Sequence, residues 1–181
     1  MPLASYDRSV GASEYQMISS LEIQGYRGFE RFELSGLGRV NLLVGTNNSG
    51  KTSILESIFL LMSAGDPASL WQVLSRRGER LVTELATSPV TFRIEAEVRH
   101  LFSGHEILEG SRFALSATSQ TSQRSIAFVV TETSLNPKTF VETADRGGIP
   151  LRGLALDVTG HPPAAIPRIP LTHTGGAPRA I

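Results

Sequence analysis

Residues 40–52 read Val-Asn-Leu-Leu-Val-Gly-Thr-Asn-Asn-Ser-Gly-Lys-Thr, an apolar run that leads into the pattern G-x-x-x-x-G-K-[ST]. Glycines at 45 and 50 allow the backbone to curl so that its N–H groups point inward, where side chains would block an anion. A lysine and a threonine follow the second glycine and supply an ammonium group and a hydroxyl. This pattern is typical of a loop that binds the phosphates of a nucleoside triphosphate.

The sequence on both sides of this loop agrees with that interpretation. The short apolar run 40–44 predicts a parallel strand that is buried on both faces. After the loop, apolar residues recur at helical spacing and predict a helix with one apolar stripe, made of Ile54, Leu55, Ile58, Phe59, Leu61 and Met62. Gly65 and Pro67 predict the end of this helix.

We refer to residues 45–52 as the phosphate loop. The residues expected to contact the nucleotide are Gly45, Thr46, Asn47, Asn48, Ser49, Gly50, Lys51, Thr52 and Ser53. Lys51 is expected to neutralise charge between the β- and γ-phosphates, and Thr52 to place its hydroxyl on Mg²⁺. The positive end of the following helix would face the anion.

Composition excludes several other classes of protein. The 181 residues contain no cysteine, which excludes disulfides and thiolate metal sites, and the four histidines show no metal-ligand spacing. The 17 basic residues balance the 17 acidic ones, so no global positive field indicates nucleic acid. Neither a membrane span nor a secretory signal is predicted, so the default expectation is a cytoplasmic protein.

Patterning divides the chain into four parts. Residues 1–16 are polar and unpatterned and predict a disordered leader that nucleotide binding does not need. Residues 17–66 form the predicted nucleotide-binding core, in which two short antiparallel strands, around 21–23 and 32–34, precede the buried strand. Residues 67–144 predict a helix followed by an antiparallel β-subdomain. Residues 145–181 are rich in glycine and proline, which leaves room only for short strands and loops.

The clearest strand of the β-subdomain is predicted over residues 89–100. Apolar residues occupy the even positions from Val90 to Val98 and are expected to be buried, while polar residues, including Glu95, face water. Further strands are predicted over 112–116, 124–132 and 138–143. The charged turn at 76–80 is expected to be a solvated surface rather than a contact with nucleic acid.

A resemblance to a known family rests on the GYRGF segment (25–29) and on the stretch NLLVGTNNSGKTSILESI (41–58). Together they resemble the opening of the ABC-type ATPases of the RecF, SMC and OLD branch, in which the loop commonly reads G-x-N-x-x-G-K-[ST] and Asn47 matches the asparagine. The resemblance implies an α/β fold, the N-terminal lobe of an ABC-type P-loop NTPase. In it, a mixed central sheet carries the phosphate loop next to the antiparallel β-subdomain.

The same resemblance implies a function. Heads of this branch bind ATP and Mg²⁺, dimerise head to head around the nucleotide, and hydrolyse it in DNA metabolism or phage defence. A basic residue in the GYRGF segment often lies near the nucleotide, so Arg27 is a candidate contact. A solvated arginine in a turn explains its presence equally well.

Hydrolysis requires residues that this chain does not clearly supply. An acidic residue at the end of a second buried strand should help to hold Mg²⁺, and the candidate is Asp157, after Leu154-Ala155-Leu156. The family places a glutamate next to this aspartate, where this chain has Val158, so a strand end or turn is the favoured interpretation. We therefore expect an incomplete head, inactive alone, with the signature motif and second acidic strand beyond residue 181.

Two other classes remain open from the sequence. The chain could be a complete module that senses ATP without hydrolysing it. It could also be a small-molecule kinase in which Asp157 takes part in catalysis.

Overall fold

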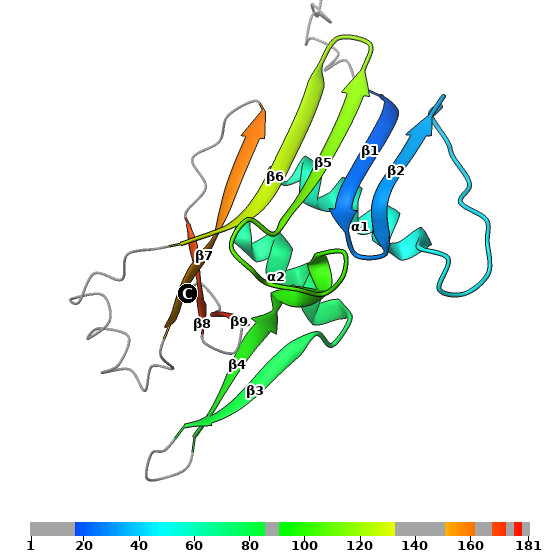
Figure 1. Cartoon of the computed structure of the whole chain (residues 1–181). Helices are drawn as coiled ribbons and strands as arrows, with labels where there is room; N and C mark the ends of the chain where they lie inside the picture. The colour runs from blue at the N-terminus through cyan, green and yellow to red at the C-terminus, as the bar shows by residue number, and fades with distance from the viewer. Residues whose placement is uncertain (1–16, 86–90, 133–150, 162–167, 173–175, 179–181) are drawn as a thin grey trace, which may run out of the picture.

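The computed structural model describes residues 17–85, 91–132, 151–161, 168–172 and 176–178. A six-stranded sheet dominates it, with the strand order β2-β1-β5-β6-β7-β8. Every neighbouring pair in this sheet is antiparallel. The six strands are β1 (Ile18–Tyr26), β2 (Phe29–Ser35), β5 (Arg112–Ser119), β6 (Gln123–Glu132), β7 (Leu151–His161) and β8 (Ile169–Thr172). The helices lie on one face of this sheet (Figure 1).

The hairpin of β1 and β2 confirms the two predicted antiparallel strands near the N-terminus. Leu21 and Ile23 are buried, while their polar neighbours on β1 face the opposite side of the sheet. Tyr26 pairs with Phe29 and closes the turn, in which Arg27 has a φ of 53°. Strand β5 pairs with the other edge of β1, so the predicted core and the predicted β-subdomain share one sheet.

Helix α1 (Lys51–Met62) begins directly at the phosphate loop and confirms the predicted helix. It ends before Gly65, whose φ is 76° and whose N–H donates to the carbonyl of Leu60 at 3.0 Å. Helix α2 (Pro67–Arg76) follows at once, because proline suits the first turn of a helix and Asp66 caps it by accepting from the N–H of Ser69.

The core lies between the helices and the large sheet. Phe113 on β5 stacks on Phe128 on β6, with 4.5 Å between the ring centroids. Tyr26 and Phe102 pack on the same ring, with centroid distances of 5.1 Å and 5.3 Å. The fully buried leucines of the helices that join this core are Leu60, Leu61, Leu70 and Leu74.

A second sheet of three strands has the order β3-β4-β9, and its hairpin of β3 (Arg80–Leu85) and β4 (Thr91–Glu97) extends away from the large sheet (Figure 1). The alternation predicted for 89–100 is only partly confirmed. Ala96 and Val98 are buried as expected, but Phe92 and Ile94 are exposed and Glu95 is fully buried. Because this hairpin projects from the large sheet, the side chains of Phe92 and Ile94 stay exposed. Glu95 instead lies beside β9 (Gly176–Pro178) and accepts a hydrogen bond of 2.8 Å from the hydroxyl of Thr172.

The buried parallel strand predicted at 40–44 is absent. These residues belong to no strand of the described part of the chain, and Val40, Leu42 and Val44 are 91%, 86% and 83% exposed. The connection from β2 to α1 runs outside the sheet (Figure 1). A strand needs at least one neighbour for its ladder hydrogen bonds, and the pairings of the described residues give it none.

The apolar stripe predicted for α1 is also only half buried. Ile54 and Leu61 join the core, but Leu55, Phe59 and Met62 are exposed. We call the exposed side chains of this region the apolar face: Val40, Leu42, Val44, Leu55, Phe59 and Met62. A helix that is apolar on both sides is normally buried on both sides.

The glycine- and proline-rich segment contains a longer strand than predicted. Strand β7 has 11 residues and pairs with β6 and β8. In the sequence, Pro150 precedes this strand and Pro162 follows it, so no proline interrupts the ladder hydrogen bonds of its interior. The predicted leader 1–16 and the predicted strand 138–143 lie outside the described residues.

Candidate functional site

The phosphate loop adopts a tight curl that ends in a helix. The N–H of Ser49 donates to the carbonyl of Thr46 at 3.3 Å, and Asn48 and Gly50 have φ values of 63° and 85°. Left-handed residues of this kind, alternating with right-handed ones, turn successive N–H groups toward one side and form an anion-binding concavity. Helix α1 starts at Lys51, so the unpaired N–H groups of its first turn face the same region.

Lys51 lies across the loop and connects its two ends. Its Nζ donates to the carbonyl oxygens of Gly45 and Thr46 at 2.8 Å and 2.6 Å and to the hydroxyl of Ser49 at 3.2 Å. These three acceptors satisfy the three donors of an ammonium group. The positive charge is therefore held within the curl, where phosphate oxygens could replace the carbonyl and hydroxyl oxygens.

Both glycines of the motif lie close to neighbouring side chains. A Cβ on Gly45 would lie 2.7 Å from the hydroxyl oxygen of Ser49. A Cβ on Gly50 would lie 2.5 Å from Cζ of Phe29, and its φ of 85° already disfavours any side chain. Phe29 therefore acts as a packing residue, and it also contacts Phe32 with 4.8 Å between the ring centroids.

The structure brings most of the predicted contact residues together on this loop. Thr46, Asn47, Asn48 and Thr52 are exposed, so their polar groups are accessible to a ligand. Ser53 differs, because it is buried and its hydroxyl accepts a hydrogen bond of 3.1 Å from Nη2 of Arg77. Its contacts in the structure are with α2 rather than with the loop.

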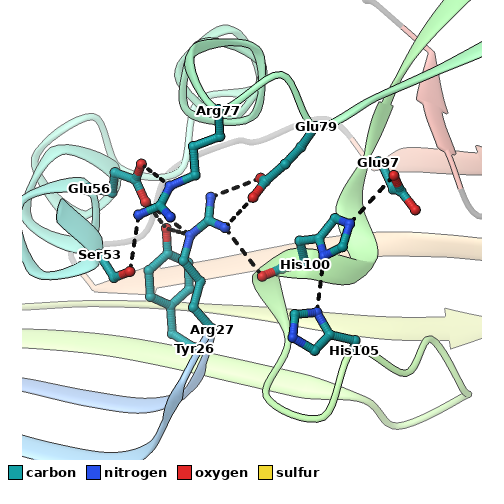
Figure 2. A network of polar contacts seen from close by, with 9 residues as sticks. All are labelled: Tyr26, Arg27, Ser53, Glu56, Arg77, Glu79, Glu97, His100 and His105. Atoms are coloured by element: carbon teal, nitrogen blue, oxygen red, sulfur yellow. Dashed lines mark hydrogen bonds and ion pairs between the residues drawn. The ribbon is translucent and has the colours of Figure 1, made fainter. Parts of the chain in front are cut away.

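Arg27 belongs to a largely buried network of ion pairs that includes Glu56 on α1 (Figure 2). Its guanidinium donates to both carboxylate oxygens of Glu79, at 2.7 Å and 3.0 Å, and its Nε lies 2.9 Å from Glu56 on α1. Arg77 donates to the other oxygen of Glu56 at 2.7 Å. We call these four charged side chains the arginine network. It holds the β1–β2 turn, α1 and the end of α2 together.

The charge of Arg27 is strongly stabilised in this position. Burial alone would lower the pKa of the guanidinium, but the hydrogen bonds to Glu79 and the nearby charges more than offset it, so the pKa of Arg27 is raised. Burial also raises the pKa of the neighbouring Tyr26 hydroxyl well above its usual range. Both groups therefore keep their protons at neutral pH. A contact of Arg27 with phosphate stays a prediction.

Sequence reasoning missed Glu56, and it placed Arg77 and Glu79 on a solvated surface. A network of alternating charges between segments far apart in the sequence leaves no local pattern. The remaining candidate, Asp157, lies within β7 rather than at a strand end. The favoured interpretation of a strand end or turn is therefore wrong, and Asp157 instead pairs with Arg168 at 2.8 Å and accepts from the hydroxyl of Thr131 at 2.7 Å.

Comparison with known proteins identifies the family. The model of the AAA ATPase domain family matches residues 17–126, which is more than half of the 181 residues. The chain belongs to the AAA ATPase domain family. A P-loop NTPase fold that binds ATP follows from this membership, and the phosphate loop is the part of this AAA ATPase domain that carries the motif.

Individual relatives are similar to this AAA ATPase domain protein over short stretches. An uncharacterized protein of Methanocaldococcus jannaschii is 40% identical over 55 residues, which are 30% of this chain and 25% of the relative. The DNA replication and repair proteins RecF of Bacillus thuringiensis and Bacillus cereus are 40% identical over 47 residues, 26% of this chain and 12% of each relative. The AAA ATPase domain described here thus spans a minor part of these relatives. No solved structure matches it.

Two kinds of feature are absent from the described residues. These residues include no helix long and apolar enough to cross a membrane. They also include no group of three or more histidine, cysteine, aspartate or glutamate residues arranged to hold a metal ion.

Proposed function

We propose that this chain binds Mg²⁺–ATP through the phosphate loop. The observation that carries the proposal is the curl of residues 45–52, in which two glycines allow close packing of the loop and Lys51 places its charge among oxygen acceptors. This arrangement fits a polyphosphate, because the acceptors of Lys51 are backbone carbonyls and a hydroxyl, which the more strongly interacting phosphate oxygens can replace.

Each residue of the loop has a proposed role. The backbone N–H groups from Gly45 to Lys51 would hold the phosphates, and Lys51 would neutralise the charge that develops when the γ-phosphate leaves. The hydroxyl of Thr52 would bind Mg²⁺, which supplies charge neutralisation between the phosphates when bound. The side chains of Asn47, Asn48 and Ser49 are proposed as additional contacts.

We further propose that ATP hydrolysis belongs to a longer protein that contains this chain. The relatives are four to eight times longer than their matched segments, and the apolar face is an exposed surface that a stable protein would cover. The remaining polypeptide would supply strands beside residues 40–44, an acidic Mg²⁺ ligand and the residues that orient the attacking water. Head-to-head dimerisation around ATP, and a cytoplasmic location, are part of the same proposal.

A role in DNA metabolism is the weaker part of the proposal. It rests on the resemblance to the RecF-like branch, since the RecF relatives are named for DNA replication and repair. The balanced charge of the chain supplies no general attraction to phosphate backbones.

The alternative of a small-molecule kinase rested on Asp157 as a catalytic residue. The pairing of Asp157 with Arg168 and Thr131 counts against that role.

The test is a titration of the purified chain with Mg²⁺–ATP, monitored by calorimetry. We expect Lys51→Ala to weaken binding by at least about tenfold, or about 1.4 kcal/mol. The matched control is Lys138→Ala, which removes the other lysine of the chain and should leave affinity unchanged. A folded chain without affinity for Mg²⁺–ATP, or equal affinity of the Lys51→Ala variant, would contradict the proposal.

Turnover then separates an ATPase from an ATP sensor. We expect no phosphate release from the isolated chain, and release from a longer protein that contains it. A longer protein that binds ATP tightly without releasing phosphate would instead support the sensor.

A further inference from the structure

Two histidines meet on the surface at a tight turn after β4. His100 lies in the short helix η1 (Val98–Leu101), and His105 lies in the turn that follows. Their Nδ1 atoms are 3.1 Å apart, and the rings meet edge to face with 5.1 Å between centroids. Both side chains are accessible to solvent. Figure 2 shows the pair at the end of the arginine network that is remote from α1.

The backbone that carries the two rings is firmly held. The N–H of Arg27 donates to the carbonyl of Leu101 at 2.9 Å, and the N–H of Ser103 donates to the carbonyl of Gly25 at 2.8 Å. Leu101 and Phe102 anchor the turn in the core. The geometry of the pair is therefore set by a rigid support rather than by two free surface side chains.

The conformation of His105 adds a second indication of function. Its φ is 59°, in the left-handed region that costs a residue with a side chain about 1 kcal/mol or more. The ring is exposed and contacts the ring of His100, so burial in the core does not offset this cost. Strained backbone positions cluster at functional sites.

A carboxylate orients one ring of the pair. Nε2 of His100 lies 3.5 Å from Oε2 of Glu97. This contact favours the tautomer with the proton on Nε2, which leaves a lone pair on Nδ1, directed at His105. A carboxylate behind the remote nitrogen of an imidazole is the usual arrangement around histidines that bind metals.

The spacing of the two nitrogens suits chelation. Two imidazole nitrogens that each lie about 2.0–2.1 Å from Zn²⁺ are about 2.9–3.4 Å apart for angles from about 90° to about 110°. The observed 3.1 Å falls inside this interval. A direct hydrogen bond between a protonated and an unprotonated Nδ1 has a similar length, so the two arrangements must be separated by experiment.

We propose that His100 and His105 form a surface site for a divalent transition-metal ion of the Zn²⁺ type. The Nδ1 atoms of both residues bind the ion, Glu97 orients His100, and water completes the coordination, since imidazole is a preferred ligand of Zn²⁺, Cu²⁺ and Ni²⁺. With two protein ligands, the affinity is modest. The site is separate from the phosphate loop and does not depend on nucleotide.

The experiment is a titration of the whole chain with ZnCl₂ in the absence of nucleotide, followed by calorimetry and by the NMR signals of the imidazole nitrogens. We expect one bound equivalent and shifts at Nδ1 of both residues. His100→Asn and His105→Asn should each weaken binding by at least about tenfold, and Glu97→Gln by about tenfold. Asparagine is chosen at 105 because it tolerates the left-handed conformation.

Two controls make the result decisive. His161→Asn removes a histidine outside the turn and should leave zinc affinity unchanged. Lys51→Ala should also leave it unchanged, so that failure of the phosphate loop and failure of the zinc site are distinguished. The proposal is overturned if the wild-type chain binds zinc no more tightly than the His100→Asn/His105→Asn double variant. That result would leave the pair as a hydrogen bond between two imidazoles. Thermal unfolding confirms that each variant is folded.

Discussion

The ring of Phe29 lies directly against Gly50, so that the hairpin of β1 and β2 supports the last glycine of the phosphate loop. The approach is so close that a Cβ on Gly50 would be 2.5 Å from Cζ of Phe29. A residue of the GYRGF segment thereby limits the conformation of a loop that begins more than ten positions later in the sequence. The contact gives a physical reason for the presence of both motifs in one chain.

The first prediction concerns this contact. Gly50→Ala should lower the free energy of unfolding by about 1–2 kcal/mol for the left-handed backbone and further for the clash with Phe29. Gly78→Ala is a matched control, because Gly78 has a φ of 72° and a Cβ at that position would have no neighbour within 4 Å. Urea unfolding measures both variants. If both variants lose the same free energy of unfolding, the close approach of Phe29 to Gly50 adds nothing to the cost of a side chain there.

The second prediction concerns the arginine network. Arg27 is only 7% exposed and its carboxylate partners are largely buried, so Arg27→Met removes the cation that pairs with Glu79 and leaves Glu56 with Arg77. We expect a loss of about 3–5 kcal/mol in the free energy of unfolding. Arg31→Met is the control, because its pair with Glu22 is 3.6 Å long and Arg31 is 74% exposed. That variant should lose less than about 1 kcal/mol. Similar losses in both would refute the buried network.

The third prediction is a loss of stability in alkali. Burial raises the pKa of Tyr26 above its ordinary value of 10.0, so the folded state keeps a proton that the unfolded state releases. The stabilisation is complete below pH 10 and is lost as the pH rises from there toward the raised pKa. The slope should reach about 1.4 kcal/mol per pH unit. Tyr26→Phe should remove this slope in unfolding curves measured between neutral and alkaline pH; an unchanged slope would argue against the assignment.

The fourth prediction concerns the apolar face. Replacing Val40, Leu42 and Val44 by threonine should change the free energy of unfolding by less than about 0.5 kcal/mol at each position, because these side chains are exposed. The isolated wild-type chain should self-associate as its concentration rises, and the triple variant should do so less. Sedimentation velocity distinguishes the two. A wild-type chain that stays monomeric would show that this surface does not drive self-association.

The fifth prediction tests the role of Asp157. If its partners are Arg168 and Thr131 alone, Asp157→Asn should leave the affinity for Mg²⁺–ATP unchanged and cost at most about 1 kcal/mol of stability, as expected for a partly exposed ion pair. Calorimetry with and without Mg²⁺ checks this. Loss of the magnesium dependence would restore Asp157 as a metal ligand.

Local patterns in the sequence predicted local structure well. The curl of residues 45–52 and the start of α1 are determined by residues that lie close together in the chain. The β1–β2 hairpin was predicted for the same reason, because alternation in two adjacent segments already defines the buried side. These parts carry the phosphate loop.

Features that depend on distant segments could not be predicted. An apolar run such as 40–44 indicates burial. The run does not indicate whether another segment of the chain pairs with it. Glu95 is buried because β9 lies beside it, and the arginine network joins residues from 27 to 79. The approach of His100 and His105 depends on a left-handed turn whose geometry has no simple spacing rule.

The exposure of the apolar face can be used to measure whether a longer polypeptide has folded over it. An antibody fragment selected against residues 40–44 should recognise the isolated chain, because this epitope is open to solvent. In a longer polypeptide that has folded over the same residues, the epitope would be hidden. Loss of antibody signal would then measure completion of the head in a cell extract, without any assay of nucleotide turnover.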